Sequence, residues 1–136
     1  ARQLAAAAKK VDLLADTDAW PKWYADMRSM AWVDAPGLGA RRKVVTNTAS
    51  LEEKFVVWEP GKRMAFHVLW MTIPLVSAFT EDFEVTPSDG GCTLRWDVRY
   101  EARRPFRWLR PVLDPTFKKM FDRGVAALPA FAKAYA

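Results

Sequence analysis

Apolar residues recur every three or four positions across the C-terminal segment 106–136, which predicts one long amphipathic helix. The apolar stripe comprises Leu113, Phe117, Met120, Phe121, Gly124, Val125, Leu128, Phe131 and Tyr135. The opposite face carries Lys118, Lys119, Asp122, Arg123 and Lys133. So broad a stripe needs a wide apolar surface to lie on. We therefore expect this helix to pack on the concave face of a β-sheet.

The N-terminal part of the chain predicts two short helices. Segment 4–15 is rich in alanine and amphipathic, as expected of a helix. Asp18 is placed to cap a second helix over 20–24, whose first turn tolerates Pro21. An acidic turn at 16–18 separates the two helices.

Short segments that alternate between apolar and polar residues predict about six strands between these helices. We expect strands at 30–33, 40–48, 51–58, 64–71, 79–86 and 94–101. The last two alternate strictly and form an antiparallel hairpin with one apolar face, on which the alternation places Glu81. Segment 64–71 is apolar in both phases, and we expect the phase without His67 to face inward, namely Met64, Phe66, Val68 and Trp70.

Composition limits the class of protein. With 136 residues, 51% of them hydrophobic, the chain is long enough for one domain with a substantial core. Its single cysteine, Cys92, excludes an internal disulfide, and no signal peptide or membrane-spanning apolar run is visible. We expect a cytoplasmic monomer or homodimer. Because the chain begins at Ala1 and not at a methionine, a targeting signal upstream of it is kept as an alternative.

A net charge of +5 raises the question of an anionic partner. The basic residues are spread along the chain without a nucleic-acid-binding motif, so we expect a solvated basic surface and no nucleic-acid partner. One group is different, because aromatic side chains are interleaved with its arginines: Arg103, Arg104, Phe106, Arg107, Trp108 and Arg110. Such a segment either makes transient contact with a membrane or fixes the start of the long helix.

Residues with catalytic potential are few. His67 has no nucleophile or metal-ligand spacing around it, so we expect a strand-surface histidine and neither a metal site nor a cofactor. Cys92 lies in a predicted turn, where a surface position is the simplest expectation. Glu81 is the candidate catalytic residue, since a carboxyl group in an apolar interior has a raised pKa and can act as a general acid or base. A pairing with an arginine, or a position at a cavity mouth, is the alternative.

Several short motifs occur in order along the chain: LLAD and WPKW at 13–16 and 20–23, PGLGAR at 36–41, WEPGKRMAF at 58–66, and DGGCTLRW at 89–96. Together they resemble the START-like superfamily, and within it the bacterial polyketide cyclase/dehydrase-like group, often labelled SRPBCC. The resemblance runs from about Val11 to the C-terminus.

The resemblance implies an α+β, helix-grip (START-like) fold over 1–136 as a single domain. In that fold a curved antiparallel sheet wraps around the long C-terminal helix, with two small helices near the N-terminus closing one end. The family opens with a strand before the first helix, which only residues 1–4 could supply here. That strand is therefore truncated or lies upstream.

The resemblance also implies a hydrophobic cavity between sheet and helix, whereas the residues alone favour a dense aromatic core. We predict that a ligand contacts Trp58, Phe66, Val68, Trp70, Phe83, Leu94, Trp96, Val98, Phe117, Phe121, Gly124 and Leu128. The expected function is binding or transport of a small hydrophobic molecule, either a lipid or an aromatic, polyketide-like metabolite. The alternative is a cyclase or aromatase that uses Glu81 in the same cavity. Binding is favoured, because the sequence does not predict several polar residues that converge in the cavity.

Overall fold

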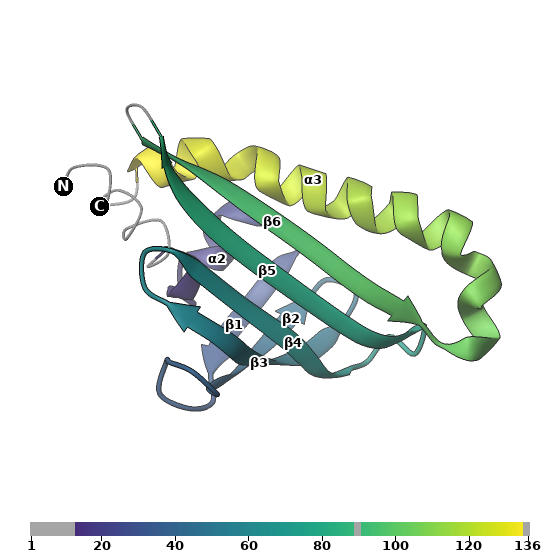
Figure 1. The fold of residues 1–136 in the computed structure, drawn as a ribbon. Helices are drawn as coiled ribbons and strands as arrows, with labels where there is room; N and C mark the ends of the chain where they lie inside the picture. The colour runs from purple at the N-terminus through teal and green to yellow at the C-terminus, as the bar shows by residue number, and fades with distance from the viewer. Residues whose placement is uncertain (1–12, 89–90, 135–136) are drawn as a thin grey trace.

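The structure is a computed structural model, and it describes residues 13–88 and 91–134 (Figure 1). Helix α2 (Trp20–Trp23) precedes six strands: β1 (Met27–Trp32), β2 (Arg41–Thr46), β3 (Ser50–Glu59), β4 (Arg63–Met71), β5 (Val76–Ser88) and β6 (Gly91–Ala102). A 3₁₀ helix, η1 (Arg104–Leu109), then leads into α3 (Arg110–Ala134). The predicted α+β helix-grip architecture is confirmed.

The six strands form one antiparallel sheet in sequence order, β1-β2-β3-β4-β5-β6. Because every connection is short, each strand pairs with its neighbour in the chain. Figure 1 shows α3 running alongside β6 across one face of the sheet. Helix α2 lies near the C-terminal end of α3, and η1 lies at its N-terminal end. The β5–β6 hairpin is the longest pair, and it supports most of the length of α3.

The predicted strands all exist, with bounds that differ by a few residues, whereas two expectations about the helices need correction. Asp18 does not cap α2: the N-cap is Ala19, and the Asp18 backbone N–H donates to the Asp16 carboxylate at 3.0 Å. The long helix begins at Arg110 and not at Phe106, because the preceding residues form η1. Only the last turn of the first predicted helix, 13–15, lies in the described part, and the expected strand at 1–4 lies outside it.

A row of contacting aromatic rings covers the sheet face beneath α2. Phe55 and Phe66 pack with ring centroids 5.3 Å apart, Phe66 and Phe83 at 5.9 Å, and Phe83 and Trp96 at 4.7 Å. Trp20 of α2 closes this cluster from above, edge-on to Phe83 and Trp96. The dense aromatic core expected from composition therefore exists at this end of the fold.

The approach of α3 to α2 depends on Gly124. A Cβ atom at Gly124 would lie 2.2 Å from Cε2 of Tyr24, so no larger residue fits without displacing that ring. The glycine thus sets a close helix approach at one end. None of the described helices is long and apolar enough to cross a membrane.

Candidate functional site

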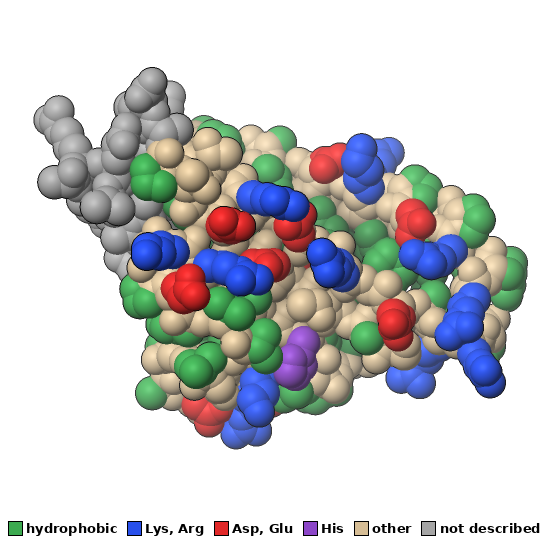
Figure 2. Space-filling view, viewed as in Figure 1, with side chains coloured by type: hydrophobic (Ala, Val, Ile, Leu, Met, Phe, Trp, Pro, Cys, Tyr) green, Lys and Arg blue, Asp and Glu red, His purple; other side chains and the backbone are tan. Residues whose placement is uncertain are grey.

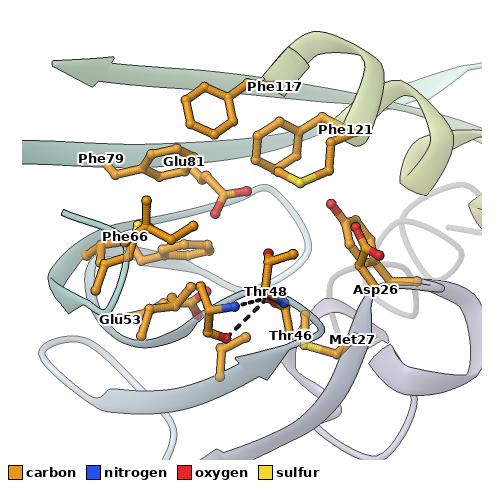
Figure 3. Close-up of a pocket in the computed structure, with 18 of the residues that line it drawn as sticks. Asp26, Met27, Thr46, Thr48, Glu53, Phe66, Phe79, Glu81, Phe117 and Phe121 are labelled. Carbon is orange, nitrogen blue, oxygen red and sulfur yellow. Dashed lines mark hydrogen bonds between the residues drawn. The ribbon is translucent and has the colours of Figure 1, made fainter. Parts of the chain in front are cut away.

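A cavity of about 350 Å³ lies between the sheet and α3, beyond the aromatic core (Figure 3). This volume falls within the roughly 300–1,000 Å³ range of small-molecule pockets. The sheet side and its loops contribute most of the lining: Met30, Val44, Thr46, Thr48, Ala49, Leu51, Glu53, Phe66, Val68, Met71, Ile73, Leu75, Phe79, Glu81 and Trp96. The helical side, the α2–β1 connection and the first residue of β1 contribute Trp20, Tyr24, Asp26, Met27, Leu113, Thr116, Phe117, Met120 and Phe121.

Aromatic rings from β5 and α3 form one wall of the cavity (Figure 3). The ring of Phe79 lies 6.0 Å from both Phe117 and Phe121, and Phe121 also packs edge-on to Trp96 at 5.3 Å. Phe117 and Phe121 are one helical turn apart on the predicted apolar stripe, which is why both reach the same strands. This wall is apolar and fixed by ring-to-ring packing.

The predicted ligand-contacting residues lie at several different places in the structure. Five of them line the cavity: Phe66, Val68, Trp96, Phe117 and Phe121. Others belong to the core cluster beside it, namely Trp58, Phe83, Leu94 and Leu128, while Gly124 packs against Tyr24. Val98 is half-buried on β6, opposite Glu81, and is not part of the lining.

Trp70 needs a correction, because it does not face inward with Phe66 and Val68. It is 43% exposed, and its indole N–H donates to the Glu52 carboxylate at 3.2 Å. The pairing of β3 with β4 shifts here, since Glu53 is opposite Val68 while Glu52 is opposite Trp70. This bulge adds one residue to β4 and reverses the phase beyond it, so Met71 lines the cavity in place of Trp70.

Glu81 projects from the middle of β5 into the cavity (Figure 3). Its side chain is buried, and one carboxyl oxygen accepts a hydrogen bond of 2.8 Å from the indole N–H of Trp96. Burial, followed by the nearby charge of Glu53, raises the pKa of Glu81 to about 8, although Trp96 and Arg42 act in the opposite direction. The group is therefore mainly a protonated carboxylic acid at neutral pH.

A second buried carboxyl group, Glu53 of β3, is held by an arginine. The Nε and Nη2 atoms of Arg42 each lie 2.8 Å from the same carboxylate oxygen, and Nη1 donates to the Leu14 carbonyl at 2.9 Å. Burial raises the pKa of Glu53, and the Arg42 guanidinium opposes that shift. Arg42 is only 1% exposed, so the expectation that the basic residues form a solvated surface is wrong for this residue.

Rings surround the Arg42 guanidinium. Its central carbon lies 4.9 Å from the Phe55 ring centroid and between 5.3 and 5.5 Å from the centroids of Trp20, Trp32 and Phe66. Such cation–π contacts partly replace the lost hydration of the charge. The ion pair is therefore a fixed internal element of the sheet face.

The sequence interpretation missed Glu53, Tyr24 and Asp26 as lining residues. A signal for Glu53 existed, since it shares a strand phase with Leu51 and Phe55, both apolar. Nothing comparable marked Tyr24 or Asp26, because they follow α2 in a connection without periodicity. The apolar loop 72–75 contributes Ile73 and Leu75 to the lining.

The other two reactive side chains lie elsewhere. His67 lies between two cavity-lining residues of β4, so its side chain projects from the opposite sheet face, where Figure 2 shows the chain's one histidine. Cys92 is the second residue of β6 and is half-buried against the core, which corrects the expected surface position in a turn. The described residues contain no group of three or more His, Cys, Asp or Glu able to hold a metal.

The chain is similar in sequence to a known family and to proteins of two mycobacteria. The sequence matches the family described as polyketide cyclase / dehydrase and lipid transport over residues 2–132. An uncharacterised protein of Mycobacterium tuberculosis is 31% identical over 115 residues, which cover 79% of this chain and 69% of that protein. A protein of Mycobacterium bovis matches to the same extent.

Solved structures share the fold at low sequence identity. A START superfamily protein from Mycobacterium smegmatis superposes with a TM-score of 0.78 at 12% identity, covering 96% of this chain and 92% of that one. The Zhui aromatase/cyclase from Streptomyces sp. R1128 gives 0.73 at 14% identity, covering 93% and 86%.

Proposed function

The chain belongs to the family of polyketide cyclases, dehydrases and lipid-transport proteins, as its motifs predicted, and on this premise we propose that it binds or transports a small hydrophobic molecule. The ligand, a lipid or an aromatic, polyketide-like metabolite, occupies the cavity between the sheet and α3. The observation that carries the proposal is the cavity itself, whose described lining consists mostly of apolar side chains.

The driving force for binding is removal of apolar surface from water. Each 100 Å² of ligand surface buried against these side chains contributes about 2.5 kcal/mol before the costs of association are subtracted. The aromatic wall of Phe79, Phe117 and Phe121 is packed before a ligand arrives, so little side-chain entropy is lost on binding. Few polar groups are available for orientation, which favours binding over multi-step chemistry.

Native mass spectrometry of the purified protein tests this proposal. We expect added mass from a co-purifying apolar compound, or from neutral lipids and aromatic polyketides supplied afterwards, that is lost on denaturation. Val68→Phe projects a ring into the cavity and should lower the bound fraction. Leu69→Phe, a matched control on the exposed outer face, should not. If no compound adds mass, or if both variants lose it equally, the proposal is wrong.

A second candidate function, catalysis of the cyclase or aromatase type, is favoured by Glu81. Its buried acid group faces the cavity and holds a proton at neutral pH, as a general acid must. In this scheme the cavity folds a flexible substrate. Glu81 protonates the departing hydroxyl group, which leaves as water, and the resulting Glu81 carboxylate takes up the proton lost from the adjacent carbon. Glu81→Gln should retain binding and lose turnover of an identified substrate. Undiminished turnover would refute the catalytic role.

Transient membrane contact through η1 and the start of α3 is a further part of the proposal. Trp108 and Val112 are 74% and 61% exposed, and Figure 2 shows Lys and Arg side chains gathered at the end where η1 lies in Figure 1. Aromatic and basic side chains together suit an anionic lipid surface. Trp108→Ala should weaken cosedimentation with phosphatidylglycerol vesicles, whereas Leu38→Ala, equally exposed elsewhere, should not. Equal loss, or no binding, would exclude this surface.

A cytoplasmic location and a monomeric or homodimeric state stay predictions.

A further inference from the structure

The charged groups of the cavity all have one sign. Three carboxyl residues, Asp26, Glu53 and Glu81, belong to the described lining, which contains no lysine, arginine or histidine. The chain as a whole carries 21 basic and 16 acidic residues, so this arrangement runs against its composition. A ligand in the cavity therefore meets carboxyl groups and no free cation.

The nearest cation is already used. Arg42 lies behind the lining, and its guanidinium nitrogens are bound to the Glu53 carboxylate and the Leu14 carbonyl. A ligand carboxylate would have to displace Glu53 from a buried ion pair, and breaking such a pair is strongly unfavourable. Arg42 thus neutralises Glu53 and offers nothing to an incoming anion.

Two polar side chains of the cavity, Glu81 and Tyr24, can donate a hydrogen bond to a ligand at neutral pH. Glu81 uses one oxygen to accept from Trp96, and its own proton is available to a ligand. Tyr24, which lines the same cavity, keeps its phenolic proton, because burial and the nearby Glu81 raise its pKa further above its ordinary value. Both groups suit an acceptor oxygen.

Resting on the proposed function, we propose that the cavity selects an apolar ligand with a neutral acceptor oxygen, such as a ketone or ester carbonyl, and rejects carboxylates. Glu81 is the residue that determines this specificity. Free fatty acids and aromatic acids are poor ligands in this scheme, whereas neutral lipids and aromatic ketones are good ones.

The groups that face Glu81 set how this selectivity depends on pH. Glu53 from β3 and Arg42 from β2 act on it by charge, Trp96 from β6 by its hydrogen bond, and Tyr24 lies across the cavity. The α3 residues of the described lining contribute no titratable group. Loss of the Glu81 proton removes the donor and places a negative charge beside the ligand. Binding of a neutral acceptor therefore weakens as pH rises through about 8.

Three probes with the same apolar body test the inference by calorimetric titration: naphthyl methyl ketone, naphthoate and naphthylmethylamine. They carry a neutral acceptor, an anion and a cation, respectively. At near-neutral pH, we expect the ketone to bind at least about tenfold more tightly than naphthoate, because like charges repel in a buried site. Ketone affinity should fall about five- to tenfold between roughly pH 6.5 and pH 9.

Two variants complete the test. Glu81→Gln keeps an N–H donor and cannot ionise, so its ketone affinity should be the same at both pH values. Glu84→Gln, exposed on the same strand, should keep the pH dependence of the unaltered protein. Naphthoate binding as tightly as the ketone, the amine binding more tightly than either, or a pH dependence that survives in Glu81→Gln would each overturn the inference. If none of the probes binds, the proposed function itself fails, and this inference fails with it.

Discussion

Replacement of Gly124 by alanine tests whether α3 is seated against Tyr24 as the structure describes. The added Cβ atom would lie 2.2 Å from Cε2, 2.6 Å from Cδ2 and 3.0 Å from Cζ of the tyrosine ring, which is itself only 6% exposed. Overpacking of this kind costs about 1–3 kcal/mol. Alanine is favoured over glycine within a helix by up to about 1 kcal/mol. The overlap outweighs the helix preference, and we expect a net loss of about 1–2 kcal/mol in the free energy of unfolding.

In a variant that lacks the Tyr24 ring, Gly124→Ala should have the opposite effect on the free energy of unfolding. Tyr24→Val removes all three ring atoms that the new methyl group would meet. In that background, Gly124→Ala retains only the helix preference and should stabilise the protein by up to about 1 kcal/mol. Urea unfolding of the four proteins in this cycle measures both effects. If Gly124→Ala stabilises the protein in both backgrounds, α3 does not lie against Tyr24, and the described position of the helix is wrong.

Two further predictions concern the buried charges, and both are measured by urea unfolding. Arg42→Met leaves Glu53 buried without its partner and should lower the free energy of unfolding by about 3–5 kcal/mol. Arg42→Met combined with Glu53→Leu should recover most of that loss. Equal stability of the single and double variants would contradict the ion pair. The folded state raises the pKa of Glu81 from 4.5 to about 8, so it binds a proton that the unfolded chain releases, and stability falls as pH rises through this interval. Glu81→Gln should therefore gain stability relative to the unaltered protein between about pH 5 and pH 8, and a constant difference would show that Glu81 titrates normally.

Much of the fold could be predicted from periodicity alone. Strict alternation in β5 and β6 placed Glu81 on the inner face, and the helical spacing of Phe117 and Phe121 placed both on the apolar stripe. These predictions succeed because each depends on local backbone geometry, which repeats every two residues in a strand and every 3.6 in a helix.

The errors arise where the geometry stops repeating or where a contact is not local. The bulge in β4 reverses the side-chain phase, and an apolar sequence in both phases carries no mark of it, so Trp70 was placed inside. The burial of Arg42 depends on Glu53 of the neighbouring strand, and a run of three basic residues conceals which one points inward. Whether aromatic residues fill a core or line a cavity depends on how far α3 stands from the sheet, which periodicity does not determine.

The chain contains one isoleucine and one histidine, and together they allow a direct test of the central claim, that a ligand enters the cavity between sheet and α3. Ile73 lines the cavity, whereas His67 lies on the opposite face of the sheet. Methyl NMR of protein labelled at the δ1 methyl group of isoleucine gives a single resonance that needs no assignment, and the histidine ring gives its own signal as an internal control. On titration with naphthyl methyl ketone, the Ile73 methyl resonance should shift and saturate while the His67 ring signal stays in place. Saturable binding that moves His67 and leaves Ile73 unchanged would show that the ligand binds elsewhere.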